Sequence, residues 1–297
     1  MPNNKSEHSN PSSGSVRKIL FIICAVAVAA AVIAAAIIMV NRANGRKRAE
    51  QQKEILNEMI SATLPPLDEE NEVVITQAPV ETEAPEPTPV VYDILDDYKL
   101  LYELNSDMIG WLKVDDTVID YPVVKTPDDE IKYLYRNFMG EDDVNGTLFM
   151  NANSVVGVGT KEFEYRDGFP PSTNMIIYGH TMKSGEMFGN LNRYESETYG
   201  KEHNIIKFDS LFEKRQYELI SVFYSQVFDD DSTAFKYYDF HQADTQEEFD
   251  YWYNNIKELS LYDTGVTAEF GDEFITLTCC AYHVDNGRFV VVAKRVA

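Results

Sequence analysis

An uninterrupted apolar run near the N-terminus is the strongest constraint on this chain. Ile19 to Val40 reads "ILFIICAVAVAAAVIAAAIIMV", 22 residues without a charge. A helix rises about 1.5 Å per residue, so one of this length spans a hydrocarbon core of roughly 30 Å. The alternative is a cleaved signal peptide, but its apolar part is usually only about 7–15 residues long, and the basic "NRANGRKR" follows where a small-residue cleavage site belongs. We therefore expect an uncleaved transmembrane anchor over residues 19–40.

The stretch after the anchor has the composition of a helix followed by a stalk. The segment "RKRAEQQKEILNEMISATL" is typical of a short helix. Leu64 to Val91 then holds six of the twelve prolines and seven acidic residues, with no basic one. Such a segment cannot bury a core and stays extended. We predict a juxtamembrane helix and stalk over residues 41–91, and a globular domain over residues 92–297.

The globular domain is strongly acidic. Between positions 92 and 297 there are 18 Lys and Arg residues and 38 Asp and Glu residues, a net charge of −20. This charge argues against nucleic acid or an anionic lipid surface as partner. We interpret it as the surface of a soluble, exposed domain.

The pattern within this domain predicts a mainly β fold. Apolar residues at helical spacing from Ile94 to Leu104 predict an opening helix, with Asp93 as its cap and Gly110 at its end. Thr245 and Glu248 form a capping box ahead of a second amphipathic helix. Short strand-like runs separated by Gly, Asn and Asp are typical of a barrel or sandwich. These runs are "TVIDYPVVK", "GTLFMN", "NMIIYGH", "NIIKFDS", "QYELISVFYSQVF", "EFITLTCC" and "RFVVVAKRV".

No pattern in the sequence points to a metal or a cofactor. The chain lacks a Gly-rich phosphate loop, its histidines are scattered, and its one cysteine pair is adjacent, which is not zinc-ligand spacing. We expect neither a metal nor another cofactor.

The adjacent cysteines Cys279 and Cys280 suggest a chemical function. Their Cα atoms are about 3.8 Å apart across a trans peptide, too close for an ordinary disulfide, and Cys24 lies in the anchor. Strand alternation places Cys279 with the apolar set, in the core, and Cys280 with Thr276 and Thr278 on a polar face. Cys280 is therefore the candidate nucleophile, and the alternative is a second buried, inert thiol.

A thiol nucleophile needs a base or a cationic partner. His180 ends the apolar run "NMIIYGH", and His283 is only three residues from Cys280; both are candidates, although either could be an ordinary solvated residue. Arg288 opens the next strand, where its guanidinium could hold a carbonyl or an oxyanion. The alternative for Arg288 is a surface cation on an acidic domain.

At these residues the chain resembles the class B sortases, cysteine transpeptidases of Gram-positive cell envelopes. Thr276 to Cys280 match the sortase pattern Thr-Leu-x-Thr-Cys, with Cys279 replacing the second Thr. The segments "MIIYGHTM" and "GRFVVVAKRV" are similar to the strands that carry the catalytic His and Arg. The segment "GWLKVDDTVIDYPVV", with the later "KYLY", resembles the N-terminal part of the class B barrel, and the helix near Phe249 resembles its helical insertion. The resemblance covers residues 92–297.

The resemblance implies an eight-stranded sortase barrel with an N-terminal helix and a helical insertion before the nucleophile strand. It implies Cys280, His180 and Arg288 as catalytic residues. The implied reaction cleaves a C-terminal sorting motif of secreted proteins, of Asn-Pro-x-Thr type or a variant, and joins them to an amine of the peptidoglycan stem or cross-bridge. Leu134, Thr278 and the loop over residues 229–240 are weaker candidates for contact with the motif.

The orientation of the anchor is subject to two opposed arguments. Lys5, Arg17 and Lys18 precede the apolar run, while four basic residues follow it closely, and this count mildly favours a cytoplasmic C-terminal side. The stalk composition and the resemblance to sortases favour an extracellular domain. We predict a cell-membrane protein with residues 1–18 in the cytoplasm and the catalytic domain outside.

Three other functions remain open at this point. One is a cysteine peptidase in which water takes the acyl group from the same motif. Another is a surface binding module with an inert thiol. The nearest is a pilus-assembly sortase, although such enzymes often carry a lid segment and a C-terminal membrane span, and this sequence stops at Ala297 just past a strand.

Overall fold

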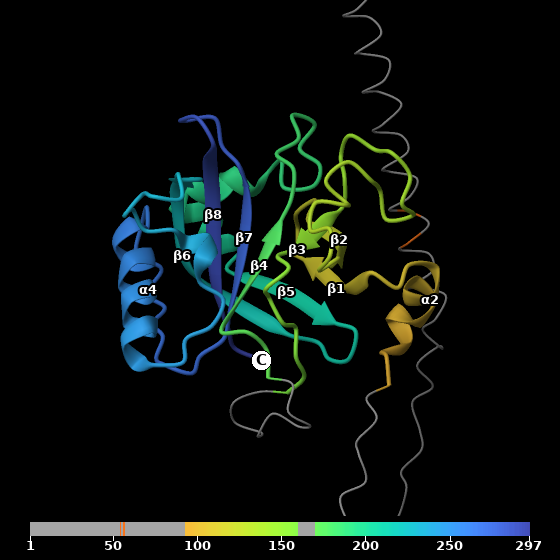
Figure 1. Ribbon diagram of the computed structural model, residues 1–297, viewed down its shortest axis with the longest axis horizontal. Coiled ribbons are helices and arrows are strands. Elements are labelled where there is room, and N and C mark those ends of the chain that lie inside the picture. Colours follow the sequence, from red (N-terminus) through yellow and green to blue (C-terminus); the bar gives the residue numbers. More distant parts are fainter. Residues whose placement is uncertain (1–53, 55, 57–92, 160–169) are drawn as a thin grey trace, which may run out of the picture. The chain divides into compact units, whose positions relative to one another are not determined.

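Eight strands close into a barrel in the order β1-β2-β3-β4-β7-β8-β6-β5 (Figure 1). Most neighbours are antiparallel, whereas β2 with β3 and β4 with β7 are parallel. This architecture confirms the expected eight-stranded, mainly β barrel. The strands are β1 (Met108–Lys113), β2 (Asp120–Val124), β3 (Leu148–Met150), β4 (Asn174–Tyr178), β5 (Ile205–Ser210), β6 (Gln216–Gln226), β7 (Phe274–Cys280) and β8 (Gly287–Arg295).

This computed structural model describes residues 54, 56, 93–159 and 170–297. The predicted anchor over residues 19–40 lies outside the described residues, as do the juxtamembrane helix and stalk over residues 41–91 apart from positions 54 and 56. Within the described ranges, no helix has the length and apolar character needed to cross a membrane. The helices there are α2 (Asp96–Leu104), α3 (Glu197–Glu202) and α4 (Gln246–Leu259), with short 3-10 turns η3 (Leu191–Glu195) and η4 (Tyr237–Asp239).

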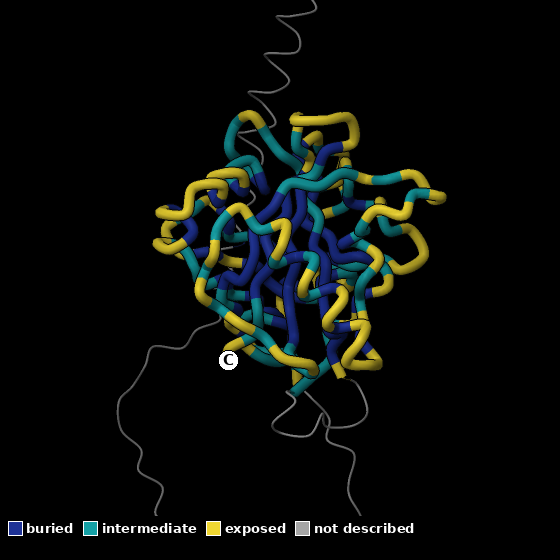
Figure 2. Tube along the Cα trace, turned by 90° about the vertical axis from the view of Figure 1, so that its left-hand side faces the viewer, coloured by how far each residue is buried: buried dark blue, intermediate teal, exposed yellow. Residues whose placement is uncertain are grey.

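The barrel interior is filled by alternate residues of the strands. On β7 these are Ile275, Leu277 and Cys279, which belong to the same buried cluster as Phe289 and Val291 of β8. Figure 2 shows the strands buried at the centre and exposure concentrated in the loops. Successive strand residues point to opposite sides, so the other half of each strand faces outward and needs a cover of its own.

Two groups of residues cover the outside of the barrel. One group, which includes Leu101 of α2 and Phe138 of the β2–β3 connection, packs on Trp111 of β1. The other group lies on β6, β7 and β8 and includes Phe249 and Trp252 of α4. Figure 1 shows α4 beside β6 and α2 near β1.

Helix α4 begins as its sequence predicts. The side chain of Thr245 accepts a hydrogen bond from the backbone of Glu248, and the Glu248 carboxylate accepts from the backbone of Thr245, which completes the capping box. Phe249, Trp252 and Ile256 form its buried face. The prediction of a capped amphipathic helix before the nucleophile strand is confirmed.

The start of the domain differs from the sequence-based expectation in two details. Asp93 does not cap α2: Leu95 is the N-cap, and its side chain accepts no hydrogen bond from the helix. The helix ends at Leu104, and Gly110 lies inside β1 rather than at the end of the helical region. A Cβ atom at position 110 would come within 2.2 Å of the backbone oxygen of Asp209 on β5, so this glycine permits close strand pairing.

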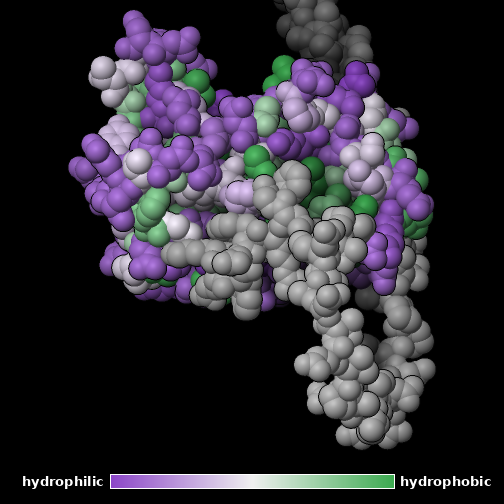
Figure 3. All heavy atoms as spheres, turned by 60° about the horizontal axis from the view of Figure 1, so that its bottom comes forward, coloured by the Kyte–Doolittle hydropathy of each residue, from purple (hydrophilic) through white to green (hydrophobic). Residues whose placement is uncertain are grey.

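The outer surface is mainly hydrophilic where charged loops and helices face solvent. Figure 3 shows this for the end of the barrel that lies at the bottom of Figure 1. Exposed ion pairs such as Lys99–Asp96 and Lys201–Glu197 lie on the outer surface of the domain. Pairs of this kind contribute only about 0–1 kcal/mol, so the two clusters and the interior account for more of the stability than the surface charges do.

Replacing the N-cap of α4 should destabilise the domain without changing its fold. Thr245→Ala removes the side-chain half of the capping box, which typically costs about 1 kcal/mol, whereas Thr245→Ser keeps the acceptor oxygen. Chemical denaturation followed by circular dichroism should show a lower free energy of unfolding for the Ala variant alone. Equal stability of the Ala variant and the wild type would show that packing alone fixes this end of the helix.

Candidate active site

The three predicted catalytic residues lie at or just beyond the ends of three neighbouring strands, β4, β7 and β8. Strand β4 pairs with β7 in parallel, with Tyr178 opposite Thr278, and His180 follows two residues later. Strand β7 pairs with β8 so that Cys280 lies opposite Arg288. His180 lies beyond the end of β4, between two residues that are bonded to β7: Gly179 donates to the Thr278 carbonyl and Thr181 to the Cys280 carbonyl, so the segment that carries His180 runs beside the end of the nucleophile strand.

The two cysteines differ as strand alternation predicts. Both are free thiols, with Cys279 buried and Cys280 exposed. Burial raises the pKa of the Cys279 thiol to about 11, although a hydrogen bond with the Thr181 side chain opposes this rise. A thiol with that pKa is almost entirely protonated at neutral pH and is a poor nucleophile. Cys280 is thus the thiol available for chemistry.

The polar face predicted for Cys280, Thr276 and Thr278 is not open to solvent along its length. Thr276 is 1% exposed and Thr278 is fully buried. The Thr276 hydroxyl donates to the side chain of Asn174 at 2.7 Å, and the Thr278 hydroxyl is 2.7 Å from the hydroxyl of Tyr237. Of these three residues, only Cys280, at the end of β7, is exposed.

His180 is held by residues of the β2–β3 connection. Its Nε2 atom lies 2.6 Å from the backbone oxygen of Leu134. A carbonyl oxygen can only accept, so Nε2 carries a hydrogen in this arrangement. The imidazole also packs on the ring of Tyr135, with ring centroids 5.4 Å apart. Leu134, which we predicted to contact the motif, thus also contacts His180 through its backbone.

The loop after His180 folds back on itself and is tied to the barrel. The backbone N–H of Phe188 donates to the His180 carbonyl at 3.0 Å. Met187 adopts a positive φ of 53°, and its N–H donates to the hydroxyl of Tyr121 on β2 at 3.2 Å. A non-glycine residue at positive φ costs roughly 1–2 kcal/mol, so these contacts hold a loop shape that the backbone alone disfavours.

Arg288 lies partly exposed beside Cys280 at the start of β8. Its Nη1 atom donates to the backbone oxygens of Asn286 and Gly287, at 3.2 and 3.0 Å. Its positive charge also acts on Tyr178 of β4, because it opposes the burial effect that raises the pKa of this phenol to about 12. Arg288 is therefore close enough to influence groups that line the strand ends.

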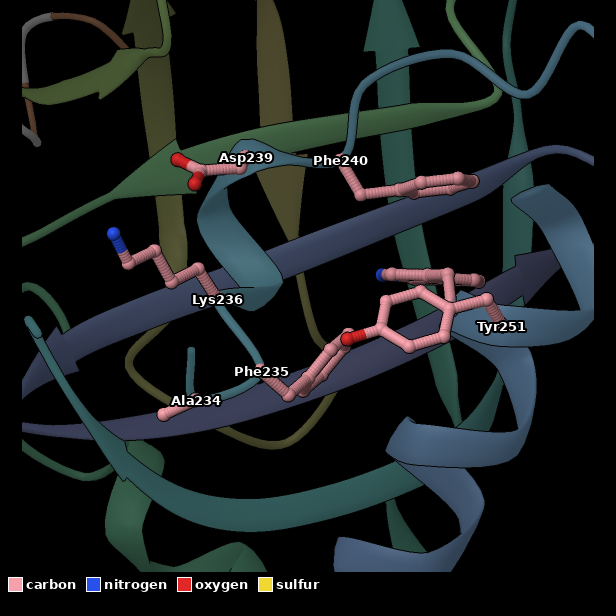
Figure 4. Close-up of a pocket in the computed structure, with 7 residues that line it drawn as sticks. Ala234, Phe235, Lys236, Asp239, Phe240 and Tyr251 are labelled. Carbon is pink, nitrogen blue, oxygen red and sulfur yellow. The ribbon is translucent and has the colours of Figure 1, made fainter. Parts of the chain in front are cut away.

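The loop over residues 229–240 packs on the outer face of the barrel, over β6, β7 and β8. Figure 4 shows Phe235 and Phe240 of this loop beside Tyr251 of α4, around a small pocket, while Lys236 and Asp239 point away from the rings. The Phe240 ring stacks on Trp252 with centroids 4.5 Å apart. Anchored in this way, the loop places Tyr237 against Thr278.

The remaining histidines of the domain have other surroundings. His203 ends α3, with its Nδ1 atom 3.2 Å from the backbone oxygen of Asp115. Burial lowers the pKa of His241, whose Nδ1 atom has no hydrogen-bond partner among the described residues. His283 packs on Tyr224, with ring centroids 4.7 Å apart. His180 is the histidine whose neighbours in the chain are hydrogen-bonded to the end of β7.

Sequence reasoning missed three residues of this region. Tyr135 and Tyr237 lie in connections with no strand or helix pattern, and they reach the site only through the fold. Thr181 donates a hydrogen bond from its hydroxyl to the backbone oxygen of Cys280, 99 residues along the chain. The aromatic character of the two connections was visible in the sequence, but no spacing signal linked them to the cysteine.

Comparison with known sequences agrees with this geometry. The sortase domain family matches residues 112–296. Sortase B of Listeria monocytogenes is 31% identical over 206 residues, which cover 69% of this chain and 76% of that protein. Sortase B of Staphylococcus aureus is 28% identical over 203 residues, which cover 66% and 73% of the two chains.

Solved structures show the same fold. The crystal structure of sortase B from Bacillus anthracis superposes with a TM-score of 0.56 at 32% identity, and covers 68% of this chain and 85% of that one. A Staphylococcus aureus sortase B–substrate complex superposes with a TM-score of 0.58 at 25% identity, and covers 69% and 86%.

Alkylation of the native protein should distinguish the two thiols. At neutral pH, iodoacetamide should modify Cys280 at least about 100-fold faster than Cys279, because Cys279 is buried and almost fully protonated. Tandem mass spectrometry of the digested full-length protein would locate the label. Cys279→Ala and Cys280→Ala are the matched variants, and concentrated guanidinium chloride should remove the difference. Comparable labelling of both thiols in the native protein would contradict the assignment.

Proposed function

The chain belongs to the class B sortases, cysteine transpeptidases that act on sorting motifs, and we propose that it anchors secreted proteins to the cell wall through Cys280. In this proposal the enzyme cleaves a sorting motif near the C-terminus of its client. It then joins the new C-terminus to an amine of the peptidoglycan stem or cross-bridge. The family membership rests on the sortase domain match and on the sortase B relatives.

The observation that supports this proposal is that Cys280 pairs with Arg288 across β7 and β8, while Thr181, next to His180, is hydrogen-bonded to the Cys280 carbonyl. An exposed thiol, an imidazole and a guanidinium on one edge are the groups that a thiol-dependent acyl transfer needs. The buried neighbour Cys279 is removed from that edge by strand alternation.

In the first half-reaction, the Cys280 thiolate attacks the carbonyl carbon of the scissile peptide bond. The carbonyl oxygen becomes an oxyanion, to which the Arg288 guanidinium donates hydrogen bonds. When the C–N bond breaks, protonated His180 gives its proton to the departing amine, and a thioester to Cys280 remains. The ring of His180 is oriented for this step by the Leu134 carbonyl and by Tyr135.

In the second half-reaction, the acceptor amine attacks the thioester carbonyl. Neutral His180 takes the proton that the amine loses, and the Cys280 thiolate leaves as the new amide forms. Each residue thus returns to its starting protonation state after one cycle. An acceptor amine in place of water is what separates a transpeptidase from a peptidase at such a site.

The strand ends and the flanking loops suggest where the motif binds. An extended Asn-Pro-x-Thr-type peptide would lie between the β2–β3 connection, with Leu134, and the loop over residues 229–240. Thr278 is fully buried and Tyr237 is only 2% exposed, so the proposed contribution of Thr278 is to hold the loop over residues 229–240 on the strand through Tyr237, without direct contact with the motif. Burial raises the pKa of Tyr237, which therefore serves as a neutral hydrogen-bonding group.

The cellular placement is part of the same proposal. The apolar run over residues 19–40 would anchor the chain in the membrane, and the Pro- and Glu-rich stalk would carry the domain outward to secreted clients. The acidic surface of the domain suits a location away from anionic lipid.

Substitutions at the three strand ends should test the chemistry. Cys280→Ala should abolish both the acyl-enzyme and the transfer product, while Cys279→Thr should keep them. His180→Ala should remove nearly all turnover, because it loses both proton transfers. Arg288→Lys should lose about 100- to 1,000-fold in rate, because a lysine ammonium cannot reproduce the planar guanidinium fork.

These variants are measured with a motif peptide and an amine, with separation of amide product from free acid by mass spectrometry. His283→Ala is the control, since it changes a histidine that packs on Tyr224 and should have a mild effect. An inactive His283→Ala beside an active His180→Ala would reverse the assignment. Free acid as the sole product at saturating amine would identify a peptidase.

The placement outside the cell predicts a protease-sensitive stalk. Protease added to intact cells with their walls removed should release a fragment that begins between Leu64 and Val91. An antibody to the catalytic domain would detect it, and a cytoplasmic protein would serve as the control for lysis. Protection of the domain until the membrane is opened would show that the basic residues after the anchor determine its orientation.

A further inference from the structure

The hydrogen bonding between β4 and β7 changes its form at the active-site end of the barrel. The backbone N–H of Gly179 donates to the carbonyl of Thr278 at 3.2 Å, as a parallel ladder requires. Two residues further on, the same ladder would use the N–H of Thr181 and the carbonyl of Cys280. Instead, the hydroxyl of Thr181 donates to the Cys280 carbonyl at 2.5 Å.

The chain turns away from β7 at Thr181. Thr181 lies opposite Met187 in an isolated antiparallel bridge, in which the N–H of Phe188 donates to the His180 carbonyl and closes the loop that follows His180. The chain therefore leaves the plane of the sheet immediately after His180. The side chain of Thr181 is what keeps this loop attached to the end of β7.

The end of β7 is thereby held from both sides. The N–H of Ala281 donates to the Gly287 carbonyl at 2.9 Å, toward β8, while the carbonyl of Cys280 accepts from Thr181, toward β4. These two bonds act on the same peptide group, which joins Cys280 to Ala281. Its orientation helps determine where the Cys280 side chain points.

We propose that Thr181 is a positioning residue of the active site, whose hydroxyl fixes the nucleophile strand relative to the histidine loop. The inference rests on the proposed catalytic roles of Cys280 and His180. Thr181 is adjacent to one of these residues and is hydrogen-bonded to the other, so a shift at Thr181 alters the geometry between them. Misplacement of reacting groups by about 1 Å can cost on the order of 100-fold in rate.

The test compares Thr181→Val, which keeps the shape and removes the hydroxyl, with Thr181→Ser, which keeps the hydroxyl. In the full-length protein, we expect the Val variant to lose about 10- to 100-fold in kcat for transfer, with little change in KM. The Ser variant should stay within about threefold of the wild type. Iodoacetamide should still label Cys280 in all three proteins, since the thiol stays exposed at the end of β7.

Thr264→Val is the matched control. Thr264 also donates its hydroxyl to a backbone carbonyl, that of Ile220 on β6, at 3.2 Å. Loss of the Thr264 hydroxyl should lower the free energy of unfolding about as much as loss of the Thr181 hydroxyl does, without lowering kcat. If Thr264→Val lost as much kcat as Thr181→Val at equal stability, or if Thr181→Ser were as slow as Thr181→Val, the positioning role would be wrong.

Wild-type activity of Thr181→Val would overturn the inference while leaving the transpeptidase intact, whereas a wild-type protein that forms no amide product would instead overturn the proposed function.

Discussion

The parallel pairing of β4 with β7 is the interaction on which the site depends. Five residue pairs, from Asn174 with Phe274 to Tyr178 with Thr278, set its register. A buried hydrogen bond from Thr276 to Asn174 links side chains of the two strands, and its geometry fits this register. A slip of one residue would displace His180 by about 3.3 Å along the sheet relative to Cys280. A slip of β7 that reversed its faces would bring Cys279 out and turn Cys280 into the core.

The cover on the outer face of the barrel determines where the chemistry becomes accessible. Helix α4 and the loop over residues 229–240 bury β7 as far as Thr278, whose hydroxyl is used by Tyr237. A buried hydroxyl without a partner would cost about 1–3 kcal/mol, so this contact stabilises both the loop and the strand. This cover ends at Thr278, two residues before β7 ends at Cys280. Cys280 lies beyond this cover and is exposed.

The parts of this structure that follow from local sequence were predictable, and the parts that depend on distant contacts were not. Alternation along β7 separated Cys279 from Cys280, and the capping box located α4, because both signals lie within a few residues. The strand β1 was missed because a helical pattern precedes it and Gly110 looks like a helix terminator, while its pairing with β5 depends on residues about 100 positions away. The contacts of Tyr237 and Thr181 with β7 likewise depend on the closed barrel.

Two adjacent cysteines at an active site raise the question of competition between thiols. A disulfide between them is disfavoured, since neighbouring residues of a strand point to opposite faces. Burial raises the pKa of Cys279 to about 11, so at neutral pH only roughly one molecule in 10,000 has this thiol ionised. A charged Cys280 would raise that pKa further, because a second negative charge nearby is unfavourable. Ionisation of the nucleophile therefore keeps its neighbour protonated and chemically inert.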